Sequence, residues 1–152
     1  METLYSVQGI LNRDFVGQIT YTICLDRTYH KLDIGLTYDK QRFAEDEITP
    51  ELEEQVARET RERYGKVLSG EALRHAILAD MKTEIHPLAM LNDTFIGCVH
   101  RQMTERHMLY DGEKVTEGCL PTAEFEGVLK VTVLVFNVIK DDTHYRLWVQ
   151  AE

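Results

Sequence analysis

The segment from Val128 to Ile139 most strongly constrains the fold, because both of its alternating sets of residues are rich in apolar side chains. Successive side chains of a strand point to opposite faces, so a strand with two apolar faces has to be covered on both sides. One set contains Val131, Val133 and Val135, and the other contains Leu134, Phe136 and Val138. The segment therefore predicts a central strand.

Three earlier segments alternate apolar and polar residues with the period of a half-buried strand. They run from Leu4 to Leu11, from Phe15 to Leu25 and from Leu32 to Tyr38. Asn12-Arg13-Asp14 supplies turn residues between the first two. The chain is therefore predicted to open with an antiparallel meander. Two later strands are expected, from Phe95 to Arg101 and from Tyr145 to Val149.

The middle of the chain changes to a helical pattern. Thr49 is an N-cap residue followed by Pro50, which suits the first helical position, and Gly65 is a natural stop. Ser69 is expected to cap a second helix that ends before Pro87. The second helix should turn Leu73, Ala76, Ile77 and Met81 toward the core. These signals predict two helices.

The order of these elements predicts one α+β domain over residues 1–152. Its sheet is mainly antiparallel, with the N-terminal meander and C-terminal hairpins, and the two helices pack on one face. Glu84 and His86 are expected at a helix end, and a short turn through Leu91 follows.

Asp111-Gly112 is a two-residue hairpin signal, which fixes a register that can be checked residue by residue. Tyr110 is predicted to face Glu113. Counting outward adds three pairs: Met108 with Val115, Arg106 with Glu117, and Thr104 with Cys119.

The charge balance argues against a nucleic-acid partner and a membrane partner. The formal net charge is -9, and a negative field repels phosphate backbones and anionic lipids. The densest basic group, Arg58, Arg61 and Arg63, alternates with glutamates, which indicates a solvated helix face. No cationic leader followed by an apolar run is present, and no run is long enough to cross a bilayer. We therefore expect a soluble protein.

The three cysteines, Cys24, Cys98 and Cys119, cannot all be paired within one chain. An odd number of thiols fits a reducing compartment better than a secreted disulfide scaffold. The sequence therefore predicts three free thiols and a cytoplasmic location.

Reactive side chains are concentrated between Glu84 and Cys119. Cys98 and His100 are two residues apart, as are Glu117 and Cys119, so each pair shares one face of a strand. Sulfur, imidazole and carboxylate ligands suit zinc, which makes these four residues a candidate metal site. The alternative is that both cysteines are small buried hydrophobes and that Glu117 pairs with Arg106 across the hairpin.

Cys119 is also a candidate nucleophile. It follows Gly118, where backbone N–H groups can approach an oxyanion, and His100 lies upstream as a candidate base. Thr116, Gly118 and Cys119, together with His100, resemble the catalytic motif of the L,D-transpeptidases. Where that motif has a histidine, this chain has Glu117. The resemblance implies a cysteine acyl-transferase with Cys119 as nucleophile and His100 as base.

Function is thus left with three alternatives. The first is a binding or interaction module, homo-oligomeric, with a polar pocket near Cys98, His100 and Cys119 that takes a small molecule or peptide. The second is a cysteine-dependent hydrolase or acyl-transferase that uses Cys119, His100 and Glu117. The third is a zinc-binding domain. No cofactor is expected, because the phosphate-binding glycine patterns are missing from the sequence.

Overall fold

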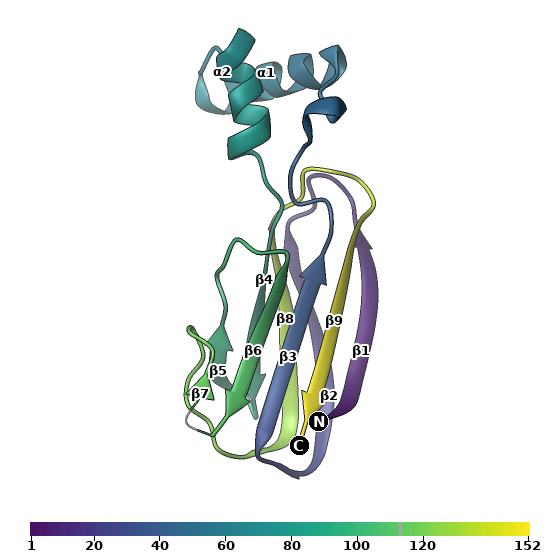
Figure 1. Ribbon diagram of the computed structural model, residues 1–152, viewed down its shortest axis with the longest axis vertical. Helices are drawn as coiled ribbons and strands as arrows, with labels where there is room; N and C mark the ends of the chain where they lie inside the picture. The colour runs from purple at the N-terminus through teal and green to yellow at the C-terminus, as the bar shows by residue number, and fades with distance from the viewer. Residues whose placement is uncertain (113) are drawn as a thin grey trace.

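The computed structural model describes residues 1–112 and 114–152 and shows two antiparallel sheets with a helical part at one end. The sheets face each other as a sandwich, and the helical part sits on the end of this sandwich (Figure 1). This arrangement confirms the α+β class. Its helices follow β3 and precede β4 in the chain, so one long excursion builds the whole helical part.

The first sheet has five strands in the order β1-β9-β3-β6-β7. Their bounds are β1 Glu2–Leu11, β9 Thr143–Ala151, β3 Lys31–Tyr38, β6 Glu105–Asp111 and β7 Lys114–Val115. The second sheet has four strands in the order β2-β8-β4-β5. Their bounds are β2 Gly17–Tyr29, β8 Phe125–Asn137, β4 Glu84–Leu91 and β5 Thr94–Cys98.

The core lies between the two sheets. It contains inward residues of every long strand, including Leu32 and Ile34 on β3 and Val131 and Val133 on β8, which are fully buried. β8 pairs with β2 on one side and with β4 on the other. The predicted central position of this segment in its sheet is therefore confirmed. The expected cover on both faces is not found, because Val128 and Phe136 of its outer face are exposed.

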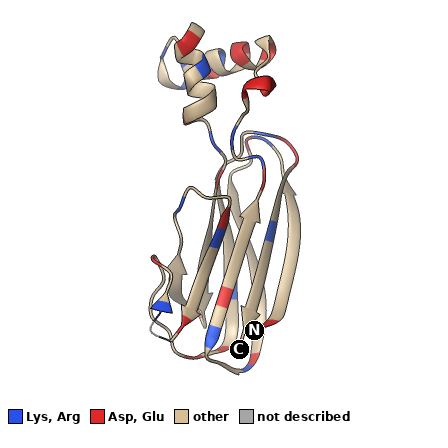
Figure 2. Cartoon of the chain, viewed as in Figure 1, with Lys and Arg blue, Asp and Glu red and all other residues tan. Residues whose placement is uncertain are grey.

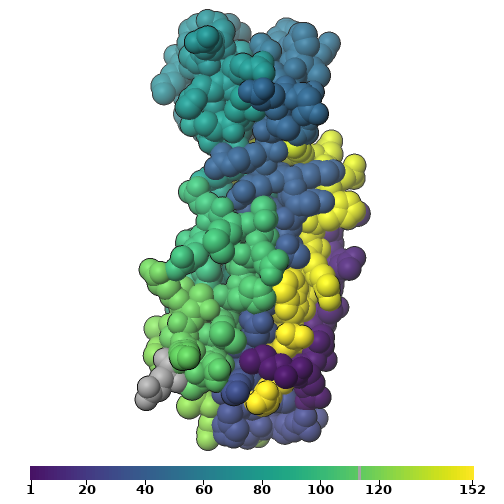
Figure 3. Space-filling view, viewed as in Figure 1, coloured from purple at the N-terminus to yellow at the C-terminus, as the bar shows by residue number. Residues whose placement is uncertain are grey.

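The helical part has its own small core. We call it the helical cap, residues 45–80, which comprises η1 Glu45–Glu47, α1 Pro50–Tyr64, α2 Gly70–His75 and the π-helical turn η2 Ala76–Asp80. Val56, Leu73 and Ile77 are its buried residues and form a cluster separate from the sandwich core. The space-filling view shows a narrower waist between the cap and the sandwich (Figure 3).

The helix ends follow local rules. The Thr49 side chain accepts a hydrogen bond from the Leu52 N–H at 3.2 Å, and Pro50 is the first helical residue. Gly65 ends α1 with a φ of 65°, a left-handed conformation that glycine adopts without a Cβ penalty. The sequence predictions for this helix are confirmed. The predicted packing of both helices on a sheet face is wrong, because their apolar sides pack on each other at the end of the sandwich.

The strand pairing differs from the predicted meander. β1 pairs with β9, β2 pairs with β8, and β3 pairs with β9 and β6, so the first three strands do not pair with one another. The physical reason is that successive strands pass from one sheet to the other across the core. Glu84 and His86 begin β4, a strand rather than a helix end, and Asn92-Asp93 turns it into β5.

The C-terminal hairpin forms with a register two residues away from the prediction. Tyr110 pairs with Val115 and Asp111 with Lys114. Met108 therefore does not face Val115. Glu113, the predicted partner of Tyr110, lies outside the described residues. β7 is only two residues long, so the pairs predicted farther out, Arg106 with Glu117 and Thr104 with Cys119, do not form either.

Charged residues gather in the helical cap and in the turns at the ends of the sandwich, whereas most of the strand surface in this view is uncharged (Figure 2). No helix in the described part of the chain is long and apolar enough to cross a membrane.

Candidate functional site

The structure brings part of the predicted cysteine and histidine cluster together. Cys98 is the last residue of β5, and its Sγ lies 3.2 Å from Nε2 of His100. The ring of His86, on β4, lies 4.6 Å from the ring of His100, between centroids, and 5.3 Å from the ring of Phe136. Cys98, His86 and His100 therefore form one contact group where β4 begins and β5 ends.

Burial shifts the pKa values of Cys98 and His86. It raises the pKa of the Cys98 thiol, and it lowers the pKa of His86, with a further contribution from the nearby Arg106. The raised pKa favours the protonated Cys98 thiol, which lies within hydrogen-bond distance of Nε2 of His100. The thiol is thereby kept in its less nucleophilic form.

Cys119 belongs to a different environment. A backbone bridge pairs it with Gly97 of β5, and the residue is only 8% exposed. The Tyr110 hydroxyl beside it donates to the Ile96 carbonyl at 3.0 Å. Burial raises the pKa of this thiol too, although the Tyr110 hydroxyl opposes the shift. No hydrogen bond joins Cys119 to His100 in the described residues.

Glu117 lies on the surface, where its carboxylate pairs with Arg101. The alternative partner predicted for it, Arg106, is 2% exposed and donates to the Tyr38 hydroxyl at 3.4 Å. Arg106 thus lies in the core, and desolvation lowers its pKa.

The geometry does not assemble the zinc ligands. Among residues 1–112 and 114–152, no three His, Cys, Asp or Glu side chains come together in a way that could hold a metal ion. Cys98 and His100 are close, whereas Glu117 points to Arg101 and Cys119 packs against Tyr110. The catalytic roles of Cys119, His100 and Glu117 stay predictions.

Alkylation by iodoacetamide will report on these thiols. We expect Cys24, which is exposed, to be labelled first, the half-buried Cys98 next and the buried Cys119 last, because reaction requires an accessible thiolate. Peptide mass spectrometry of the folded protein over time gives the order, and labelling in denaturant gives the control in which all three react. Fastest labelling at Cys119 would instead support the acyl-transferase interpretation.

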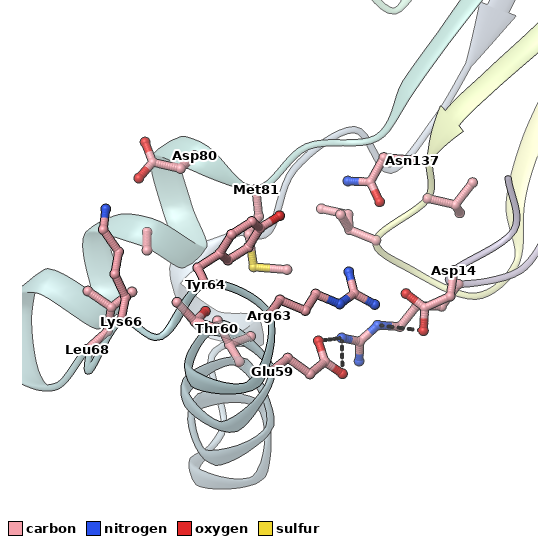
Figure 4. Close-up of a pocket in the computed structure, with 15 residues that line it drawn as sticks. Asp14, Glu59, Thr60, Arg63, Tyr64, Lys66, Leu68, Asp80, Met81 and Asn137 are labelled. Carbon is pink, nitrogen blue, oxygen red and sulfur yellow. Dashed lines mark hydrogen bonds and ion pairs between the residues drawn. The ribbon is translucent and has the colours of Figure 1, made fainter.

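A cleft lies where the helical cap meets the end of the sandwich (Figure 4). Its volume is about 500 Å³. We call it the junction cleft. Its lining comes from the β1–β2 turn, α1, the residues after α1, η2 and the end of β8. The lining residues are Arg13, Asp14, Val56, Glu59, Thr60, Arg63, Tyr64, Lys66, Leu68, Ala76, Asp80, Met81, Asn137, Val138 and Ile139.

Polar contacts fix the walls of the cleft. Arg13 donates to Glu59 of α1 at 3.1 Å, which ties the β1–β2 turn to the cap. The backbone of the same turn is held by Asp141, which accepts from the Arg13 N–H at 3.0 Å, and by Val138, which accepts from the Asp14 N–H at 3.0 Å. The cleft is therefore a built junction between cap and sandwich.

The charges of the cleft are unequally paired. Arg13 is neutralised by Glu59, whereas two cations, Arg63 and Lys66, and one carboxylate, Asp80, make no ion pair with any described residue. Arg63 extends from α1 across the cleft, on the side where Asp14 and Asn137 lie (Figure 4). Apolar side chains, among them Met81, line the rest. The cleft thus offers an apolar surface beside unpaired cations.

Sequence reasoning missed this site. Arg63 and Glu59 lie in the alternating run interpreted as a solvated helix face, but both line the cleft. Five separate segments contribute to the lining, and none carries a recognisable motif. The turn residues Asn12-Arg13-Asp14 and the interruption of the helix at Gly65 were the only local signals at these positions.

The whole chain, residues 1–152, matches the model of one protein family, described as a family of unknown function (DUF6669). No curated protein and no solved structure matches the chain.

Proposed function

This chain belongs to the DUF6669 family over its whole length, and we propose that it is a binding module whose junction cleft holds a small amphipathic molecule with one anionic group. The observation that carries the proposal is the cleft itself, about 500 Å³ in volume. Ligand sites are typically clefts of about 300 to 1,000 Å³ with a mainly apolar lining and a few polar groups that fix orientation.

The anionic group is inferred from Arg63. A guanidinium presents a planar fork of N–H donors that matches a carboxylate or phosphate. Arg63 has no carboxylate partner among the described residues, in contrast to Arg13, which Glu59 neutralises. Lys66 adds a second unpaired cation to the lining. The lining as a whole balances three cations against three carboxylates, Asp14, Glu59 and Asp80, so the preference for an anion is proposed for the surroundings of Arg63 rather than for the whole cleft.

The apolar part of the ligand is inferred from the remaining lining. Val56 and Leu68 come from the cap, Met81 directly follows the cap, and Val138 and Ile139 directly follow β8. Methionine is flexible and polarizable, so Met81 can adapt to ligands of different shape. A short acyl chain or a small ring system fits such a surface.

The location proposed for this module is the cytoplasm. All three cysteines are free thiols in the structure, which supports a reducing compartment. Homo-oligomerisation is the other part of the proposal, and it depends on a different region of the molecule.

Binding of the fluorescent anion 1-anilinonaphthalene-8-sulfonate tests the site. We expect the folded chain to enhance the dye's fluorescence saturably and Arg63→Gln to weaken binding about tenfold, since a hydrogen bond to a charged group contributes about 1.5 to 3 kcal/mol. Arg74→Gln is the matched control, because Arg74 is an exposed cap residue outside the cleft and should leave binding unchanged.

Competition separates the charge of the ligand from its apolar part. Decanoate should displace the dye, and decyltrimethylammonium, with the same chain length and opposite charge, should not. Equal displacement by both, or unchanged dye binding by Arg63→Gln, would overturn the proposal. Near-ultraviolet circular dichroism of each variant verifies that the tertiary structure is intact.

A further inference from the structure

The two longest edge strands of the sandwich lie on the same side and are open. β1 is the first strand of its sheet and pairs with β9, and β2 is the first strand of the other sheet and pairs with β8. The rings of Tyr5 and Tyr21, one from each strand, lie 5.8 Å apart between centroids. An unpaired edge presents a row of backbone N–H and C=O groups that can pair with another chain.

The opposite side of the sandwich is protected. β7 is only two residues long, which is one common way to blunt an edge. β5 is covered by the segment around Cys119: the Cys98 N–H donates to Gly118 at 3.0 Å, and the Leu120 N–H donates to Ile96 at 2.8 Å. The edge strands β5 and β7 are therefore protected from pairing with another chain, whereas the edges formed by β1 and β2 are open.

The first nine residues of β2 lack the usual devices that prevent edge pairing. Gly17–Leu25 contains no charged residue and no proline, and its regular pairing with β8 shows no bulge before Leu25. In the described residues, no other backbone segment hydrogen bonds to this stretch. β1, in contrast, carries a register shift between Thr3 and Tyr5 and a glutamate, Glu2.

The sequence of this stretch is self-complementary. Residues 19–23 read Ile-Thr-Tyr-Thr-Ile, a palindrome centred on Tyr21. Two antiparallel copies related by a two-fold axis at Tyr21 would place Ile19 opposite the second copy's Ile23, and Thr20 opposite its Thr22. Threonine pairs and β-branched pairs directly opposite each other stabilise antiparallel strands. An isologous interface needs this kind of self-matching surface.

We propose that the open edge of β2, Gly17–Leu25, pairs antiparallel with the same edge of a second copy of this chain, with the two-fold axis at Tyr21. The two four-stranded sheets then join into one continuous sheet of eight strands. The second copy is the occupant because the stretch is uncharged and palindromic: it matches itself, and two chains of net charge -9 meet where neither carries charge. The Tyr21 hydroxyl is held by the Tyr145 hydroxyl at 2.6 Å, which fixes the central residue.

Light scattering of the intact chain tests the association. We expect a mass twice the 17.6 kDa of one chain at high concentration. Thr22→Lys should weaken the dimer roughly tenfold or more, because an edge lysine is a natural block to pairing and two such lysines would lie close together across the axis. Thr94→Lys is the matched control, an exposed threonine on the opposite edge strand of the same sheet, and it should remain dimeric.

Disulfide trapping tests the register without relying on a destabilising charge. With the axis at Tyr21, Gln18→Cys places a thiol directly opposite the second copy's Cys24, within the range that a disulfide spans. Diamide should therefore link this variant into covalent dimers. Thr22→Cys is the control, because its thiol would be offset along the strand by four residues, about 13 Å, from the second copy's Cys24 and by two residues, about 7 Å, from the second copy's own introduced thiol.

Each result decides the proposal. Dimers of the intact chain that Thr22→Lys dissociates, together with linkage of Gln18→Cys but not of Thr22→Cys, support it. A monomer at high concentration, a dimer that resists Thr22→Lys, or equal linkage of both cysteine variants would overturn it. Circular dichroism and melting curves confirm that each variant is folded.

Discussion

The Ile77→Ala variant will lose the hydrogen-exchange protection of the helical cap while both sheets keep theirs. Ile77 is fully buried in a cluster with only two other buried residues, Val56 and Leu73. Truncating a buried isoleucine to alanine costs about 2 to 5 kcal/mol, which a core of this size cannot absorb. Protection of cap amides should therefore fall by about a hundredfold, the ratio that corresponds to about 2.7 kcal/mol.

Phe125→Ala is the matched comparison in the sandwich core. Phe125 is fully buried, and its ring packs edge-on against Tyr110 at 5.2 Å between centroids. Its truncation should cost about 3 to 5 kcal/mol and lower protection throughout both sheets. Hydrogen exchange followed by mass spectrometry distinguishes the two patterns. Equal loss in cap and sheets for Ile77→Ala would show that the two cores unfold as one unit.

The Gly118→Val variant should lose about 4 kcal/mol of folding free energy, because a β-branched residue at a positive φ costs about 1 to 3 kcal/mol and overpacking costs about as much again. Gly118 has a φ of 96°, and a Cβ built there would lie 2.3 Å from the Cys98 carbonyl oxygen. The contact is with backbone, so no side chain can move away. Thermal unfolding should shift downward by about 10 °C, at about 2 to 4 °C per kcal/mol for a chain of this size.

Gly65→Ala separates strain from close approach. Gly65 also has a positive φ, 65°, but a Cβ there would meet nothing within 4 Å. We expect a loss of only about 1 kcal/mol at this helix end, the cost of holding an alanine in the left-handed conformation. Comparable melting temperatures for the two variants would contradict the steric account of Gly118. The close approach of the Cys98 carbonyl is thus a structural reason for a glycine at position 118 that does not depend on an oxyanion site.

Local physics explains why α1 was predicted well. Thr49, Pro50 and Gly65 act within a few residues of themselves, so their effects are visible in the sequence. The central strand β8 was predicted from its apolar alternation, and it does have a neighbouring strand on each edge. Coverage of both faces was not met, because Val128 and Phe136 of its outer face are exposed. Strand β4 was missed because its polar start, Glu84 and His86, and its Pro87 resemble the end of a helix.

The cysteine and histidine cluster shows that sequence spacing predicts contacts within one segment but not contacts between segments. Cys98 does lie beside His100, as predicted, but β5 ends at Cys98 rather than at Arg101, so the contact forms beyond the end of the strand. The position of Cys119 relative to His100 depended on how the segment after β7 returns to β5, which no local rule determines. The sequence could therefore name reactive residues without stating which of them meet.

By itself, the sequence determined the type of most elements, the limits of the first helix and the segment that had to be central, because these depend on neighbours along the chain. Only the tertiary structure decided that β1 joins β9, that β2 joins β8 and that the helices pack on each other rather than on a sheet. It also decided that five distant segments enclose the junction cleft. These features arise from contacts between residues that are far apart in sequence, where many pairings satisfy the same alternation and only the packing of the whole core selects one.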